Sequence, residues 1–175
     1  MKVSIKPIHS LIIIFITLLS ASISAQEVKW MTWDEAATLV ATEKNPKKVF
    51  IDVYTDWCGW CKKMDKDTFQ NAEVAAYMEA NFYMVKLDGE GKENIEYKGK
   101  VFKFVPSGRK GYHELAATLL QGRLSYPTTV FLDEEMNMLS PVPGYQKPDA
   151  FLEIARYFGD NIHKEKKWQE YTQSK

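Results

Sequence analysis

The order of apolar and polar residues along the chain predicts alternating helices and strands. Runs of β-branched and aromatic residues predict buried strands, and they cover 48–54, 82–87, 128–132 and, after a turn, 138–142. Apolar residues at helical spacing predict helices, which run from a capping box at Thr32 and Glu35 to Asn45, from about Cys58, from Asn71 to Ala80, from Tyr112 to Gln121 and from Pro148 to Phe158. Strands separated by helices predict an α/β fold in which helices flank a mixed central sheet.

Two segments depart from this alternation. Between 88 and 111 the chain is polar and contains several glycines, and residues 95–105 alternate around Lys98-Gly99 as a small hairpin would. We interpret residues 107–114 as a solvated loop and helix start, in preference to a border of the functional site. Residues 160–175 are mostly polar, so we expect them to extend the last helix or to fray, with their lysines (Lys164, Lys166, Lys167) on a solvated face.

Residues 1–25 have the three-part pattern of a secretory signal peptide. Lys2 and Lys6 precede an apolar run over 11–19, and small residues follow up to Ala25, so cleavage is expected between Ala25 and Gln26. The alternative is a membrane anchor, which needs about 20 consecutive apolar residues. Because the apolar run is shorter, we expect cleavage, no stable membrane anchor afterwards, and a periplasmic or secreted protein.

Composition and charge narrow the function classes. The chain has 175 residues, 45% of them hydrophobic, which suits one domain over residues 26–175 and excludes a large multidomain enzyme. The formal net charge is zero, and it falls to −2 without residues 1–25, which carry Lys2 and Lys6 and no acid. Nucleic acid is therefore not an expected partner, since phosphate binding requires a basic excess. We expect a monomer.

The chain has two cysteines, Cys58 and Cys61, which follow the predicted strand 48–54 and open a helix. Unpaired backbone amides at a helix start favour a thiolate at Cys58, which we expect to be the more exposed of the two. Because the thiolate is the form that attacks a disulfide, this spacing predicts that Cys58 attacks and that Cys61 resolves the product.

Three other interpretations of the cysteine pair compete with redox chemistry. A structural bridge over so short a loop would stabilise the fold by only about 2 kcal/mol. Half of a zinc site would need two more ligands, and neither His113 nor His163 has ligand-like spacing. A pair of incidental buried thiols does not account for the position at a helix start. Redox chemistry explains the pair best.

Two stretches of the chain resemble the thioredoxin-like family. Residues 48–61 (KVFIDVYTDWCGWC) resemble its active-site strand and turn, and residues 125–132 (SYPTTVFL) resemble its cis-proline loop and the following strand. Lys86 and Gly144 also fit the family pattern. The resemblance covers about 45–155, and it implies a thioredoxin-like fold with an insertion at about 88–125 and a C-terminal helical extension at about 160–175.

The resemblance also implies roles for individual residues. Asp52, six residues before Cys58, would be a buried acid with a raised pKa that assists proton transfer at Cys61. The alternative is that Asp52 hydrogen-bonds to backbone at the end of its strand. A cis Pro127 would expose backbone for an extended substrate segment. The implied substrate-binding residues are Trp57, Gly59, Trp60, Tyr126 and Pro127.

The implied function is a thiol–disulfide oxidoreductase that acts on protein substrates together with an unidentified redox partner protein. No metal or organic cofactor is implied beyond the Cys58–Cys61 disulfide. Thioredoxin has Gly-Pro between its cysteines where this chain has Gly59-Trp60, so its reducing strength does not carry over, and reductant, oxidant and isomerase all stay open. The alternatives are a binding or chaperone module with a structural or vestigial cysteine pair and, less favoured, a metal-handling thiol protein.

Overall fold

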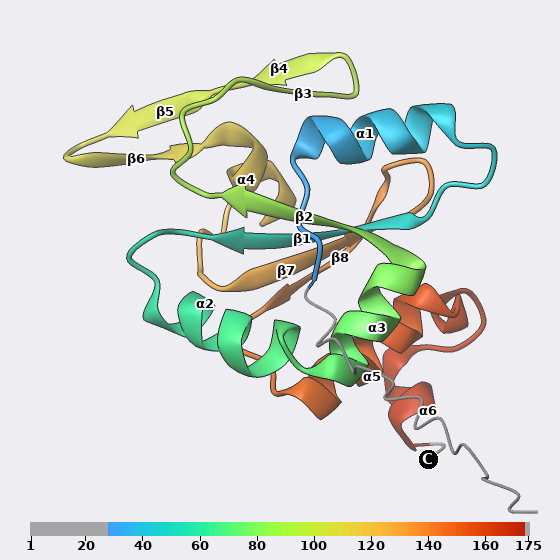
Figure 1. The fold of residues 1–175 in the computed structure, drawn as a ribbon. Coiled ribbons are helices and arrows are strands. Elements are labelled where there is room, and N and C mark those ends of the chain that lie inside the picture. The colour runs from blue at the N-terminus through green and yellow to red at the C-terminus, as the bar shows by residue number, and fades with distance from the viewer. Residues whose placement is uncertain (1–27, 174–175) are drawn as a thin grey trace, which may run out of the picture.

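The computed structural model describes residues 28–173, so the predicted signal peptide and its cleavage site lie outside the described residues. Helices and strands alternate along this part of the chain as the sequence predicts (Figure 1). The elements are α1 (Trp33–Thr42), β1 (Lys48–Tyr54), α2 (Gly59–Met64), η1 (Asp65–Phe69), α3 (Ala72–Asn81), β2 (Phe82–Asp88), β3 (Ile95–Tyr97), β4 (Lys100–Phe102), β5 (Phe104–Ser107), β6 (Lys110–His113), α4 (Glu114–Leu119), β7 (Thr128–Leu132), β8 (Met138–Pro143), α5 (Pro148–Gly159), η2 (Ile162–Lys164) and α6 (Trp168–Gln173).

The central sheet is mixed, as predicted. Its strand order is β2-β1-β7-β8, with β1 parallel to β2 and antiparallel to β7, and with β8 antiparallel to β7 at one edge. The register places Asp52 of β1 between Lys86 of β2 and Thr129 of β7. A polar group in the middle of the sheet therefore has a lysine as its nearest neighbour on one side.

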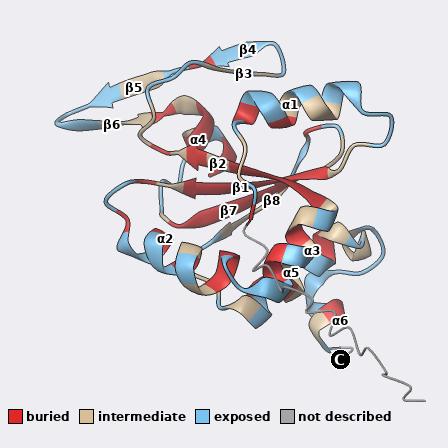
Figure 2. Ribbon diagram, viewed as in Figure 1, coloured by how far each residue is buried: buried red, intermediate tan, exposed pale blue. Residues whose placement is uncertain are grey.

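Helices cover both faces of the sheet (Figure 1). One buried cluster joins β1, β2 and β7 to α3 and α5, and the other joins the opposite faces of these strands to α1 and α4. Along β1, Phe50 belongs to the first cluster, whereas Val49 and Ile51 belong to the second. Since side chains alternate along a strand, Asp52 shares the face of Phe50, which is the face covered by α2 and α3. Figure 2 shows the burial of the central strands between the two helical layers.

Several local predictions are confirmed. Thr32 and Glu35 form a complete capping box at the start of α1, and Asn71 caps α3 by accepting bonds from the amides of Glu73 and Val74. The hairpin β3–β4 turns at Lys98-Gly99, where both residues have positive φ values of 51° and 74°. No helix within residues 28–173 is long and apolar enough to cross a bilayer.

The prediction for residues 107–114 is wrong in part. Residues 107–113 belong to a second hairpin, β5–β6, which turns at Gly108, whereas the predicted helix does start within this stretch, at Glu114 and not at Tyr112. The physical reason lies at His113, whose Nδ1 accepts a hydrogen bond from the Leu115 amide and so caps α4. The residues before His113 therefore stay extended. Strand β6 gives no clear signal in the sequence, because polar and small residues dominate residues 107–111.

The C-terminal segment is partly helical, as the resemblance implies, but it does not extend α5 as a continuous helix. The last core helix α5 ends at Gly159, and Asn161 with φ of 60° breaks the helical path before α6. Tyr171 of α6 packs against the ring of Tyr157 and is buried. Trp168 of the same helix also contacts Tyr157, with ring centroids 5.2 Å apart, so both rings hold the segment against the core, whereas Lys164, Lys166 and Lys167 are exposed, as predicted.

Candidate active site

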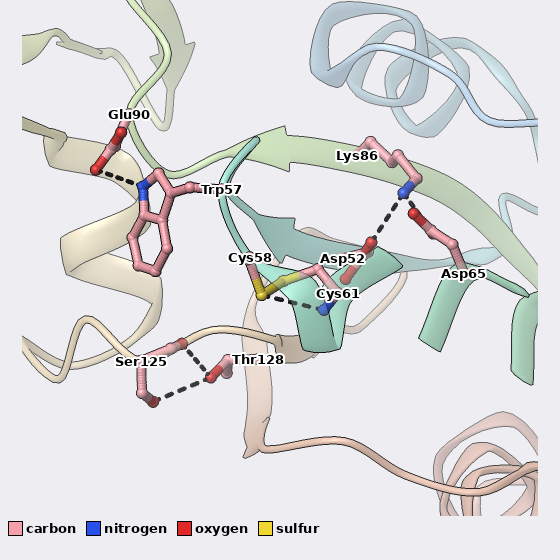
Figure 3. The surroundings of a disulfide bond; sticks show 9 residues. All are labelled: Asp52, Trp57, Cys58, Cys61, Asp65, Lys86, Glu90, Ser125 and Thr128. Carbon is pink, nitrogen blue, oxygen red and sulfur yellow. Dashed lines mark hydrogen bonds and ion pairs between the residues drawn. A yellow bond between two sulfur atoms is a disulfide. The ribbon is translucent and has the colours of Figure 1, made fainter. Parts of the chain in front are cut away.

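The two cysteines form a disulfide at the point where β1 passes into α2 (Figure 3). Their sulfurs are 2.09 Å apart and their Cα atoms 5.3 Å apart. The Cys58 amide donates to Thr55 O at 3.0 Å, which closes the turn after β1. The Cys61 amide donates to the Cys58 sulfur at 3.0 Å. After reduction, this donor would favour negative charge on Cys58, which is the property that an attacking cysteine needs.

Both cysteines are largely covered. Cys58 is 4% exposed and Cys61 2%, so the predicted order of exposure is confirmed by a small margin only. A reacting thiol or disulfide must therefore come close to the cysteine sulfurs, and the residues around the pair determine which molecules can do so.

Asp52, on β1, belongs to the surroundings of the disulfide drawn in Figure 3 and is 1% exposed. Burial raises the pKa of its carboxyl from 3.8 to about 6, while the Lys86 ammonium opposes the rise and the Asp65 carboxylate adds to it. The predicted upward shift of the pKa is thus confirmed. The alternative of a backbone hydrogen bond is wrong, because neither carboxyl oxygen of Asp52 has a hydrogen-bond partner among the described residues.

The loop before β7 contains the peptide bond that the resemblance implies. The Tyr126–Pro127 bond is cis. Pro127 O accepts the Gly144 amide at 2.8 Å, and Ser125 O accepts the Thr128 hydroxyl at 2.8 Å. These bonds fasten the loop to both β7 and the end of β8. Figure 3 draws Ser125 and Thr128 of this loop among the surroundings of the disulfide.

Trp57, directly before Cys58, is 57% exposed and is held from three sides. Its indole Nε1 donates to Glu90 Oε1 at 3.0 Å, Lys110 Nζ lies 4.4 Å from the ring centroid, and the Tyr126 ring meets it edge to face at 5.9 Å. Glu90 and Lys110 both come from the segment between β2 and β7. Our preference for residues 107–114 as a solvated loop that does not border the site is therefore wrong at Lys110. Neither residue has a signal in the sequence beyond its charge.

Trp60, between the cysteines, is 59% exposed. Its ring lies 5.5 Å from that of Tyr145, whose hydroxyl donates to Asp67 Oδ2 at 3.1 Å. The neighbouring Gly59 is exposed, and a Cβ there would meet no heavy atom within 4 Å. Two exposed indoles thus flank Cys58 in the sequence, each braced by a tyrosine.

Asp65, which the sequence analysis missed, also belongs to this site. It opens the π-helix η1 that continues α2, and its Oδ1 accepts a hydrogen bond from Lys86 Nζ at 2.5 Å. No pattern of hydrophobic spacing signals a carboxylate that reaches a neighbouring strand. Among the described residues, no group of three or more His, Cys, Asp or Glu side chains could hold a metal ion.

The sequence model of the Thioredox_DsbH family, described as a protein of unknown function (DUF255), matches residues 18–145. Uncharacterized protein B0495.5 of Caenorhabditis elegans is 27% identical over 124 residues, which are 70% of this chain and 14% of that protein. The thiol:disulfide interchange protein DsbD of Ralstonia nicotianae is 26% identical over 133 residues, which are 75% of this chain and 18% of that protein. The chain thus spans less than a fifth of the length of these two relatives.

The fold also has a solved counterpart. The structure of a thioredoxin-fold protein from Helicobacter pylori matches with a TM-score of 0.54 and 20% identity, over 73% of this chain and 79% of that one. The predicted thioredoxin-like fold is confirmed.

Proposed function

Because the chain belongs to the Thioredox_DsbH family, we propose that it is a thiol–disulfide oxidoreductase that exchanges disulfides with protein substrates through Cys58 and Cys61. The observation that carries the proposal is the disulfide at the start of α2, where the Cys61 amide donates to the Cys58 sulfur. The buried carboxyl of Asp52 in the surroundings of the disulfide supports it, since perturbed acids gather at reactive sites.

In the reductive direction the exchange takes two steps. The Cys58 thiolate attacks a substrate disulfide, a mixed disulfide forms, and the first substrate thiolate leaves and takes a proton from water. The Cys61 thiol then gives its proton to Asp52, and its sulfur attacks that of Cys58. The Cys58–Cys61 disulfide forms while the second substrate thiolate leaves, so two electrons pass to the substrate. A redox partner protein returns them; the same steps in reverse oxidise a substrate.

We assign substrate binding to the surface around the disulfide. The backbone at the cis Tyr126–Pro127 bond would pair with an extended substrate segment. Trp57 and Trp60 offer exposed apolar surface on either side of Cys58 in the sequence, and the open space at Gly59 leaves room for the substrate backbone. No metal or organic cofactor is needed for the exchange, and the protein would act as a monomer.

We also propose that the protein works outside the cytoplasm, in the periplasm or after secretion. The signal-like pattern of residues 1–25 supports export, and so does the chemistry, because disulfides persist in oxidising compartments. DsbD of Ralstonia nicotianae, a relative by sequence, is by its name a thiol:disulfide interchange protein.

The test is thiol chemistry on three purified forms: the unchanged protein, Cys58→Ser and Cys61→Ala. The unchanged protein should cycle between dithiol and disulfide and reduce a test protein disulfide such as that of insulin. Cys58→Ser should lose both abilities, whereas Cys61→Ala should retain attack and accumulate a mixed disulfide visible by mass spectrometry. A protein that does not cycle, with Cys58→Ser behaving like the unchanged form, would overturn the proposal in favour of a binding module with a structural bridge.

A further inference from the structure

The ammonium group of Lys86 is shared between two carboxylates (Figure 3). Its Nζ lies 2.5 Å from Asp65 Oδ1 and 3.2 Å from Asp52 Oδ2, and only the bond to Asp65 has hydrogen-bond geometry. Two aromatic rings also contact this ammonium, since Trp30 lies 4.8 Å and Tyr54 5.0 Å from it. Lys86 is thus held in place, and Asp65 is its stronger partner.

The backbone fixes Asp65 relative to the cysteines. The Asp65 amide donates to the carbonyls of Cys61 and Lys62, at the junction where the α-helix α2 becomes the π-helix η1. A π-turn inside a helix redirects the side chains that follow it and is frequent at functional sites. Here the carboxylate of a residue on the cysteine-bearing helix reaches Lys86 on strand β2.

From this arrangement, and resting on the proposed function, we propose that Asp65 is a positioning residue for the exchange. It holds the Lys86 ammonium short of a full ion pair with Asp52, so that Asp52 stays able to accept the proton of Cys61 and to give it back. The Asp65 carboxylate acts through Lys86 and by its own charge, and it does not touch the sulfurs.

The charges around Asp52 support this role. Lys86 of β2 and Asp65 of η1 are the charged groups among the described residues that shift the pKa of Asp52. Tyr54 of the same strand contacts the Lys86 ammonium at 5.0 Å, and the cysteine pair does not titrate while oxidised. A full ion pair at this depth would lower the pKa of a carboxyl strongly, yet the pKa of Asp52 is raised to about 6, first by burial, against the pull of Lys86 and with the help of Asp65.

Lys86 and Asp65 are partly exposed to solvent, whereas Asp52 is not. Lys86 and Asp65 line a hollow of about 220 Å³ together with Trp30 and Gln70. The side chain of Lys86 is 25% exposed and that of Asp65 34%, against 1% for Asp52.

The test is a titration of the Asp52 carboxyl carbon by ¹³C NMR in the oxidised protein, where no thiol titrates. Asp65→Asn should lower the midpoint by about one pH unit, because Lys86 is then released to Asp52 and a neighbouring negative charge is lost. Lys86→Met should raise the midpoint by about one unit or more, and Asp65→Glu should restore it toward that of the unchanged protein. The matched control is Asp67→Asn, on the same π-helix, whose carboxylate pairs with Lys63 at 2.5 Å instead.

Asp65 would lose this role if Asp65→Asn and Asp67→Asn had the same midpoint, or if Asp65→Asn raised it. Should Asp65→Asn fail to fold, two variants still test the proposal. It requires that Asp65→Glu has a midpoint close to that of the unchanged protein and that Lys86→Met has a raised midpoint. A second measurement, the pH profile for resolution of a mixed disulfide on Cys58, should shift with the NMR midpoint. If the protein does not cycle between dithiol and disulfide, both the proposed function and the role of Asp65 in the exchange are overturned. If it cycles but Asp65→Asn does not shift the NMR midpoint, only the role of Asp65 is overturned.

Discussion

At the scale of single residues, the sheet register determines the chemistry of Asp52. Its place on the α2 face of β1 buries it, and the register with β2 brings Lys86 beside it. The residue type and its spacing from Cys58 could be found in the sequence, and so could the burial. The contact between Lys86 and Asp65 could not, because it depends on where a π-helix begins and on which strand lies opposite.

The raised pKa of Asp52 makes the stability of the oxidised protein depend on pH. Burial is the first cause of the rise, and the pKa is about 6 in the folded protein against 3.8 ordinarily. Between these values the folded state binds the additional proton, so the free energy of unfolding contributed by this group is fully present below about pH 4 and is lost as the pH rises through about 6.

Asp52→Asn should therefore stabilise the oxidised protein at pH 7.5 by about 1–3 kcal/mol, at 1.36 kcal/mol for each unit of pKa shift. The gain should shrink toward zero at pH 4, where the native carboxyl is already neutral. Urea unfolding at the two pH values measures it. The control Asp56→Asn removes an exposed carboxylate close to Cys58 and should change stability by about 0.5 kcal/mol or less. An equal gain at both pH values would show that ionisation of Asp52 is not the cause.

At the scale of elements, the two hairpins between β2 and β7 differ in what they contact. In β3–β4, Lys100 lies 4.5 Å from the ring centroid of Phe102, within the hairpin itself. In β5–β6, Lys110 lies over the indole of Trp57, beside Cys58. The second hairpin thus shapes the surface next to the disulfide, which suits a segment that selects partners.

We expect Lys110→Ala to raise KM for a protein disulfide several-fold and to leave the reduction rate of a small aromatic disulfide unchanged. The reason is that Trp57 loses one of the contacts that hold its ring, while the sulfurs keep their surroundings. The lysine side chain is 62% exposed, so the free energy of unfolding should change by about 0.5 kcal/mol or less. Steady-state kinetics with both substrates give the result, and equal effects from the control Lys100→Ala would contradict a specific role.

The elements themselves were predictable to different degrees. The strands of the sheet and the helices α1, α3 and α5 carry strong apolar patterns or caps, and each was found close to its observed bounds. The sequence does not reveal the hairpin β5–β6, because residues 107–111 are polar or small and because Phe104 and Val105 continue the alternation of the hairpin predicted over 95–105. The contact of Lys110 with Trp57 depends on that pairing, and the contact of Glu90 depends on the loop after β2, so neither follows from the sequence pattern.

At the scale of the whole molecule, the disulfide and the C-terminal helix occupy separate regions. Figure 1 shows α6 beyond α3 and α5, well away from the turn between β1 and α2. The structure ties α6 to the core through Tyr171, which stacks on Tyr157 at 5.5 Å, and through Lys166 O, which accepts the Tyr157 hydroxyl at 2.8 Å. The polar sequence around Tyr171 concealed this anchor, because one buried side chain gives no periodic pattern.

This separation predicts that stability and reactivity respond independently to a change at Tyr171. Tyr171→Ala should lower the free energy of unfolding by about 2–4 kcal/mol, since it removes a buried aromatic ring. The rate at which dithiothreitol reduces the disulfide of the folded protein should stay within about twofold, because no contact of Cys58, Asp52 or Lys86 depends on α6, as for effects at distant sites. Thr172→Ala is the control, as its hydroxyl bonds to carbonyls of its own helix. A stability like that of the control would show that α6 does not belong to the core, and a changed reduction rate would show that the two regions are coupled through the sheet.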